Sequence, residues 1–107
     1  MSYIYRIENK KGLGCYQFFQ CKNEIFNKLI AEKHDDDPIH HPMPLWDEGI
    51  DRKQKKIEIS GFKNLKQLYK WFSSEDIDNL EYLGFKIQKI KVKKITAIGK
   101  CQVLAIK

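Results

Sequence analysis

The stretch that decides the fold is NLKQLYKWFSSEDIDNLEYLGF, which spans residues 64–85. Asn64 followed three residues later by a glutamine fits a capping box, so a helix is expected to begin after Asn64. A further helix is expected from Ser73 or Ser74, because two acidic residues in its first turn favour the helix dipole. The apolar side chains at helical spacing are Leu65, Leu68, Trp71, Phe72, Ile77, Leu80 and Leu83. The stretch therefore predicts two consecutive helices, the second ending at Gly84, where a C-terminal glycine belongs.

Strands are predicted on both sides of these helices. Residues 3–8 show the period-two pattern of a strand, and residues 57–59 repeat it over a shorter run. Residues 86–94 place apolar side chains among five lysines, and residues 101–106 are apolar enough for a central strand. A helix is also predicted over residues 23–33. The pattern indicates an α+β fold, with an antiparallel sheet of about four to five strands and about three helices packed on one face.

Three finer expectations concern the segment before the first helix, the regularity of the lysine-rich strand and the composition of the core. Residues 15–19 read as a short strand or as the lead-in to the first helix, for which Asn23 is the expected N-cap. In the lysine-rich strand, the slip in apolar spacing from Ile87 to Ile90 indicates a bulge. We expect the core to contain Ile4, Ile7, Phe26, Leu29, Leu65, Leu68, Phe72, Leu80, Leu83, Phe85, Val92 and Val103.

The composition is that of a chain that buries a core. The 107 residues suffice for a single domain, residues 1–107, and 42% of them are hydrophobic. The net charge of +6 favours acidic partners, although lysines carry it with only two arginines, as an AT-rich genome also produces. No apolar run is long enough to span a bilayer and no signal peptide is visible, so the expected location is the cytoplasm. The odd number of cysteines, three, disfavours a disulfide framework.

Residues 34–56 show no helix or strand period, and they hold all three prolines, all three histidines and two acidic clusters. An irregular stretch of about 20 residues in a compact domain is often functional. Its histidines and aspartates are metal-ligand types, but their spacing matches no established site, so we expect a solvated acidic turn and no metal. The prolines would hold His41, Trp46 and Asp47 in fixed positions for binding. The alternative is that Trp46 packs on the core.

Arg6 and the lysines of the predicted strand are further candidates for binding. Arg6 lies within an apolar strand, where an arginine clamps a phosphate, pairs with an acid or faces solvent. Lys89, Lys91 and Lys93 form a basic face suited to nucleic acid. A charged strand that blocks edge-to-edge aggregation needs the same residues. No aromatic residue interleaves with these lysines along the strand, as base-stacking platforms would.

Four segments together carry a family resemblance. The first three are Tyr5-Arg6-Ile7-Glu8-Asn9 with Gly12, Gly14 and Tyr16, His41-Pro42-Met43-Pro44 with Asp47 and Gly49-Ile50, and Gly61-Phe62 with Leu65, Gln67-Leu68 and Trp71-Phe72. The fourth is Leu83-Gly84-Phe85, followed by Gly99-Lys100 and Gln102-Val103. In these segments, which span most of the chain, the sequence resembles a group of small proteins carried by bacteriophages and prophages.

This resemblance implies a protein that counters host defence, as anti-CRISPR proteins do by occupying a surface of a larger enzyme. The leading hypothesis is a non-catalytic inhibitor, without a cofactor, of a host nucleic-acid-dependent defence enzyme. It would act in the host cytoplasm through residues 34–51 together with Arg6 and Trp46. The second hypothesis is a small nucleotide- or NAD-binding enzyme, because the first-strand arginine is similar to that of ADP-ribosyltransferases. That enzyme needs Arg6, His41 and Asp47 in one pocket. The third is direct nucleic-acid binding through the lysine-rich strand.

Overall fold

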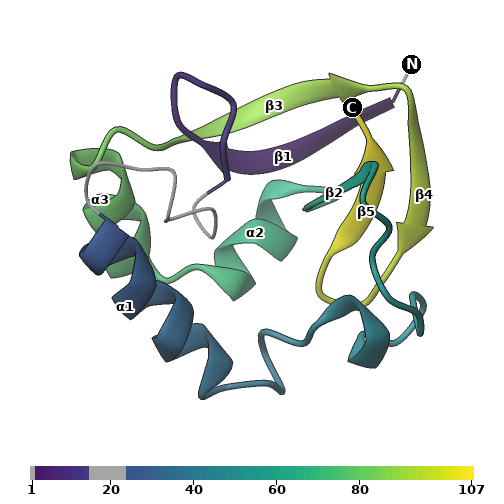
Figure 1. Ribbon diagram of the computed structural model, residues 1–107, viewed down its shortest axis with the longest axis horizontal. Coiled ribbons are helices and arrows are strands. Elements are labelled where there is room, and N and C mark those ends of the chain that lie inside the picture. The colour runs from purple at the N-terminus through teal and green to yellow at the C-terminus, as the bar shows by residue number, and fades with distance from the viewer. Residues whose placement is uncertain (1, 15–23) are drawn as a thin grey trace.

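The computed structural model describes residues 2–14 and 24–107, and Figure 1 shows how their helices and strands are arranged. In chain order the elements are β1 (Ser2–Glu8), α1 (Glu24–Asp35), the short 3-10 helix η2 (Pro44–Trp46), β2 (Glu58–Gly61), α2 (Leu65–Trp71), α3 (Ser74–Tyr82), β3 (Lys86–Val92), β4 (Lys94–Ile98) and β5 (Val103–Ile106). The predicted α+β class is confirmed. No helix in the described part of the chain is long and apolar enough to cross a membrane.

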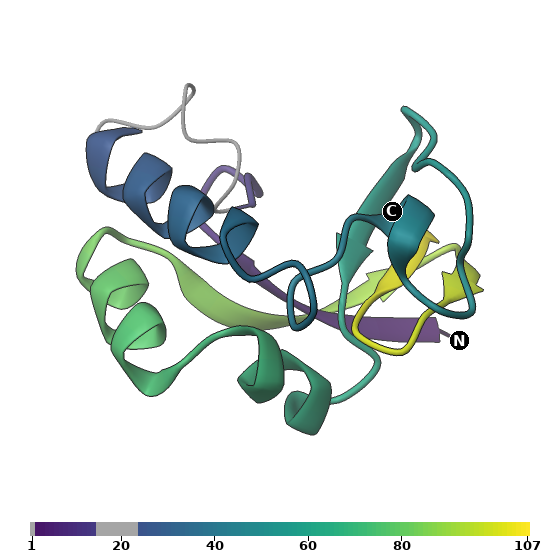
Figure 2. The same cartoon turned by 90° about the horizontal axis from the view of Figure 1, so that it is seen from below.

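The strands pair antiparallel in two small sheets rather than in one. β1 and β3 form a two-stranded ribbon, and β5 is the central strand between β2 and β4, as its apolar character predicted. The two sheets meet where Tyr5 and Phe62 exchange backbone hydrogen bonds of 2.8 Å in each direction. All three α-helices lie below the ribbon in Figure 1. Figure 2 shows α1 apart from α2 and α3, with the line of the ribbon running between them.

The predicted bulge in the lysine-rich strand is wrong. β3 pairs with β1 in unbroken register, with Ile87 opposite Ile7 and Ile90 opposite Ile4. Successive side chains of a strand alternate between its faces, so Ile4 and Ile7 point to opposite faces of the ribbon. Each of them joins a different core cluster. The change in apolar spacing between Ile87 and Ile90 therefore arises because the two faces of the ribbon pack on different core clusters. The register shift lies instead in β4, where it pairs with β5.

Helices α2 and α3 begin and end where local sequence signals predicted, whereas α1 extends to Asp35, two residues beyond its predicted end. Asn64 Oδ1 accepts a hydrogen bond from the backbone N–H of Gln67 at 2.8 Å, so Asn64 caps α2. Ser73 and Asp76 form a reciprocal capping box at the start of α3. Gly84 follows α3 with a φ of +93°, a conformation that favours glycine over residues with a side chain. Residues 15–19 and the Asn23 cap, by contrast, lie outside the described residues.

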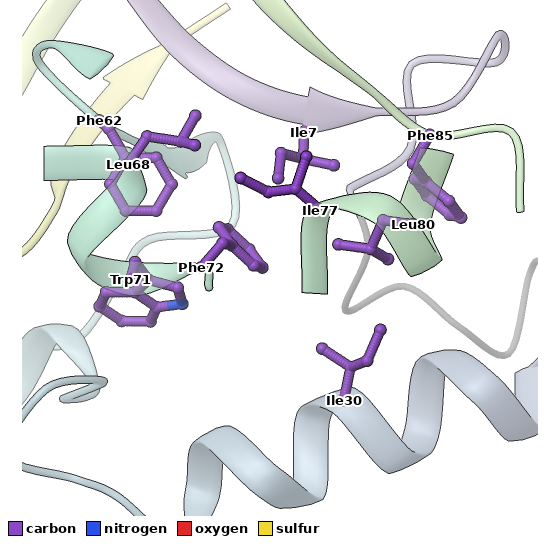
Figure 3. Close-up of a cluster of buried hydrophobic side chains, with 9 residues drawn as sticks. All are labelled: Ile7, Ile30, Phe62, Leu68, Trp71, Phe72, Ile77, Leu80 and Phe85. Atoms are coloured by element: carbon purple, nitrogen blue, oxygen red, sulfur yellow. The ribbon is translucent and has the colours of Figure 1, made fainter. Parts of the chain in front are cut away.

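The larger core cluster lies among the helices and the ribbon (Figure 3) and consists of Ile7, Ile30, Phe62, Leu68, Trp71, Phe72, Ile77, Leu80 and Phe85. A smaller cluster joins the ribbon to β5 and consists of Ile4, Val92, Val103 and Ala105. Most of the predicted core is confirmed, but Leu65 is exposed. Leu65 is the first residue of α2, and the inward face of that helix is formed by Leu68 and Trp71. The side chains of Phe26 and Leu29 lie outside the described part.

Candidate functional site

The acidic loop, which we define as residues 35–51, presents three large apolar side chains to solvent. The exposed fraction is 82% for Ile39, 67% for Met43 and 75% for Trp46. The loop also holds six of the 14 acidic residues of the chain and none of its 20 lysines and arginines. The alternative that Trp46 packs on the core is therefore wrong. The loop is an apolar surface set among negative charges in an otherwise basic protein.

Asp47 fastens the end of the acidic loop to the turn between β4 and β5. Its side chain is buried, and its carboxylate accepts hydrogen bonds of 3.1 Å from the backbone N–H groups of Cys101 and Gln102. The Gln102 amide in turn donates to the carbonyl oxygen of Pro42 at 2.7 Å. Burial raises the pKa of the Asp47 carboxyl, although the backbone hydrogen bonds favour its ionised form. The expectation that Asp47 touches a partner is corrected, because this carboxylate is buried in the protein and anchors the loop.

His41 fastens the middle of the loop to the helices. Its Nε2 lies 2.6 Å from the carbonyl oxygen of Trp71, and its Nδ1 lies 3.1 Å from that of Asp37. The imidazole also stacks on that of His34. A neutral imidazole has one N–H and donates to one of the two carbonyls, whereas the imidazolium donates to both. Because both ring nitrogens face protein acceptors, His41 ties the loop in place and is poorly placed to serve as an acid or base for a substrate.

The expectation that His34 belongs to the irregular binding stretch is wrong, because His34 lies in α1 and its side chain is buried. Its Nε2 lies 2.9 Å from Asp76 Oδ2, and Lys33 Nζ lies 2.9 Å from Asp76 Oδ1. Burial lowers the pKa of His34 and outweighs the hydrogen bond with Asp76. Burial acts to raise the pKa of Asp76, but the hydrogen bonds from His34 and Lys33 help to lower it overall. The missed signal is that His34 follows Ile30 by one helical turn, so it shares the buried face of α1.

Arg6 and His41 line one cleft, which has a volume of about 370 Å³. The Arg6 Nε donates to the carbonyl oxygen of Ser60 at 2.8 Å, and the guanidinium pairs with Glu8. Asp47 lies outside this cleft, so the three residues expected for a nucleotide-binding enzyme do not converge. Within residues 2–14 and 24–107, no group of three or more His, Cys, Asp or Glu side chains is arranged to hold a metal ion. The cleft is lined by residues of the acidic loop, the ribbon and the helices, and its Arg6 and His41 side chains make contacts within the protein.

The lysines of β3 lie beside aromatic rings, contrary to the expectation from the strand's own sequence. Lys89 is opposite Tyr5 and Lys91 is opposite Tyr3 in the pairing of β1 with β3. The Lys89 Nζ lies 5.2 Å from the centroid of the Tyr3 ring and 5.9 Å from that of Tyr5. The rings were missed because they come from the partner strand. Lys93 is exposed between β3 and β4, and its backbone N–H donates to the carbonyl oxygen of Ile106 at 2.7 Å.

Comparison with known families matches the whole chain to one of them. A family model described as the Bacteriophage T4 Y00F protein covers residues 1–107. The chain belongs to this family. Membership of the Y00F family confirms the expectation of a small phage protein. No curated protein and no solved structure matches the chain. The Y00F description names a phage and no activity, so a function has to be inferred from the surfaces described above.

Proposed function

We propose that this phage protein is a non-catalytic inhibitor of a host nucleic-acid-dependent defence enzyme, comparable to anti-CRISPR proteins. It would act in the host cytoplasm by occupying a basic, nucleic-acid-binding surface of that enzyme with its acidic loop. The observation that carries the proposal is Trp46, an aromatic side chain left 75% exposed next to the buried anchor Asp47. A large exposed aromatic on a fixed backbone is the kind of residue that dominates protein–protein binding.

The loop is held in shape before any partner arrives. His41 fastens it to the carbonyl oxygen of Trp71, and Asp47 and Gln102 fasten it to the β4–β5 turn. Pro44 at the start of η2 limits the backbone further. Binding by a preorganised loop loses little conformational entropy, so more of the contact energy appears as affinity. These contacts support a role for the loop in recognition.

The distribution of charge favours a basic partner surface. Besides the buried anchor Asp47, the acidic loop carries five acidic residues and no lysine or arginine, whereas the rest of the chain is strongly basic. Enzymes that bind nucleic acid present lysines and arginines to the phosphates. Carboxylates grouped around exposed apolar side chains complement such a surface and compete with its nucleic acid. The proposal therefore commits to a partner that binds nucleic acid through the surface that the loop covers.

The cleft favours binding over catalysis. The two ring nitrogens of His41 face carbonyl oxygens, and Arg6 is paired with Glu8 and with the carbonyl of Ser60. A general acid or base needs a group within hydrogen-bond reach of substrate, and a phosphate clamp needs guanidinium N–H groups that are available. These internal contacts argue against the second hypothesis, a nucleotide- or NAD-binding enzyme that uses Arg6 and His41.

The experiment is capture of partners from host lysate by the affinity-tagged protein, with and without nuclease. We expect a stoichiometric protein that survives nuclease, is retained by Tyr82→Ala and is lost with Trp46→Ala. Tyr82 is the matched control, because its side chain lies on α3 and is 92% exposed. The captured protein is then purified, and its binding to a labelled nucleic-acid duplex is measured. The wild-type protein should abolish that binding and Trp46→Ala should not. A partner that Trp46→Ala retains, or whose duplex binding is unaffected, would overturn the proposal.

A further inference from the structure

We infer that the face of the ribbon formed by Tyr3, Tyr5, Lys89 and Lys91 binds single-stranded nucleic acid. We call it the Tyr–Lys face. It belongs to a different surface from the acidic loop, and the inference does not depend on the proposed inhibition. In Figure 1 the β1–β3 ribbon lies at the top of the molecule, while the segment between α1 and β2, which includes the acidic loop, runs along the bottom.

The pairing register places the four side chains together. Tyr3 is opposite Lys91 and Tyr5 is opposite Lys89, in a ladder without interruption. Residues two apart in a strand share a face, and so do residues directly opposite in an antiparallel pair. The two rings and the two ammonium groups therefore alternate across one side of the ribbon. This is the interleaving of basic and aromatic groups that base-stacking surfaces use.

The geometry brings a positive charge next to each ring. The Lys89 Nζ lies 5.2 Å from the Tyr3 ring centroid and 5.9 Å from that of Tyr5, within the range of cation–π contacts. Tyr3 is nevertheless 43% exposed, and Lys91 is exposed beside it. A base that stacks on Tyr3 would bring its phosphate close to these two lysines. Tyr5 is half-buried and packs against the larger core cluster, so Tyr3 is the ring of this face that is available for stacking.

The charge of the ribbon favours a polyanion. Its acidic residue, Glu8, is buried and points to the face opposite Tyr3 and Tyr5. Glu8 is also neutralised there by Arg6 and by Lys107. Lys86 is opposite Glu8 in the pairing and shares its face, so the positive charge of the Tyr–Lys face comes from Lys89 and Lys91. No carboxylate of β1 or β3 therefore opposes phosphates at the Tyr–Lys face.

The rings select single strands over duplexes and over acidic proteins. In a duplex the base faces are already stacked on one another, so a protein that binds it reads phosphates and groove edges. Exposed bases stack on aromatic rings whatever their sequence. An acidic peptide would use the lysines but would gain nothing specific from Tyr3. The expected ligand is thus DNA or RNA with unpaired bases, bound with little sequence preference.

The test is fluorescence anisotropy with labelled single-stranded DNA of about 16 nucleotides, the RNA of the same sequence and the matching DNA duplex. We expect at least one single strand to bind more tightly than the duplex. Tyr3→Ala should weaken binding by about tenfold, whereas Tyr3→Phe, which keeps the ring, should not. Lys89→Gln with Lys91→Gln should also reduce the slope of log affinity against log salt by about 1.4, because two phosphate contacts are lost.

Two controls keep the outcome clear. Lys53→Gln with Lys56→Gln removes the same charge from exposed positions before β2, and it should leave most of the affinity in place. Trp46→Ala should bind oligonucleotides like the wild type, so failure of the Tyr–Lys face and failure of the acidic loop are distinguishable. Thermal unfolding confirms that each variant is folded. Equal binding of duplex and single strands, no loss with Tyr3→Ala, or no binding at about 50 mM salt would overturn the inference.

Discussion

His34 and His41 stack face to face, with their ring centroids 4.1 Å apart and their planes within 7° of parallel. His34 belongs to α1, and His41 belongs to the acidic loop. The stack therefore joins the loop to the helix at the point where His34 also contacts Asp76. Two positive charges at this separation would repel each other, so the arrangement favours at least one neutral ring.

This pair predicts a loss of stability in mild acid. Burial gives the folded protein a pKa for His34 below the value of 6.5 expected in the unfolded chain. The unfolded state then binds more protons as the pH falls below about 6.5, so the free energy of unfolding decreases there. The slope from this group is at most about 1.4 kcal/mol per pH unit. Urea denaturation at about pH 7.5 and about pH 5.5 measures it.

The matched variants for this prediction are His34→Gln and His40→Gln. His34→Gln should lower stability at both pH values but flatten the dependence on pH. His40 is exposed and lies outside the stacked pair, so His40→Gln is the control that removes an imidazole without disturbing that pair. A pH dependence that survives in His34→Gln would assign the effect to other groups.

Substitution of two neighbouring residues of the acidic loop should change the free energy of unfolding by very different amounts. Asp47→Ala leaves the part-buried N–H of Cys101 and the buried N–H of Gln102 without their acceptor and should cost about 2 to 3 kcal/mol of unfolding free energy. Trp46→Ala removes an exposed ring and should change the free energy by less than about 0.5 kcal/mol. Urea denaturation of both variants measures this contrast. A large destabilisation by Trp46→Ala would show that the ring packs against the protein and would remove it from the binding surface.

Gly99 should be coupled to Asp47. A Cβ atom at Gly99 would lie 2.4 Å from Asp47 Oδ2 and 2.9 Å from Ile50 Cδ1, so the carboxylate needs a glycine beneath it. Gly99→Ala should destabilise the protein by about 1 to 3 kcal/mol. The cost should be smaller in the Asp47→Ala background, because the clash with the carboxylate is gone. A double-mutant cycle measures this coupling, and strictly additive free energies would contradict it.

Glu58 should make the protein sensitive to strong acid. This buried carboxylate accepts two hydrogen bonds of 2.8 Å from Arg52 and one from the hydroxyl of Thr96 on β4. The Arg52 guanidinium holds the pKa of Glu58 well below its ordinary value of 4.5. Its contribution is therefore present above about pH 4.5 and is lost as the pH falls below it.

The variant that tests this contribution is Glu58→Gln. It should cost about 1.5 to 3 kcal/mol at neutral pH and should weaken the loss of stability in acid. Glu81→Gln, at an exposed position of α3, should resemble the wild type. Urea denaturation at about pH 3 and about pH 6 compares them. An unchanged acid dependence in Glu58→Gln would place the effect elsewhere.

Features set by neighbouring residues could be predicted from the sequence, and features set by distant residues could not. The caps at Asn64 and Ser73 join atoms three residues apart, so the local pattern is sufficient. Asp47 accepts a hydrogen bond from Gln102, which lies 55 positions away in the sequence, and no local sequence pattern around Asp47 predicts that contact. Tyr3 likewise comes to lie beside the lysines of β3 only through the strand register. The loop could be selected as a candidate, but which of its side chains point outward depended on those distant contacts.

The ribbon also sets the order of events in folding. Ser2 pairs with Val92 and Glu8 with Lys86, so β1 gains its partner only after nearly the whole described chain has been brought together. Closing so long a loop costs much chain entropy, whereas α2, α3 and the β4–β5 pair use contacts close in the sequence, so we expect the transition state to be built from those local contacts. The N-terminal strand should therefore dock after the rate-limiting step. Ile4→Val should accelerate unfolding in stopped-flow measurements while leaving the refolding rate almost unchanged.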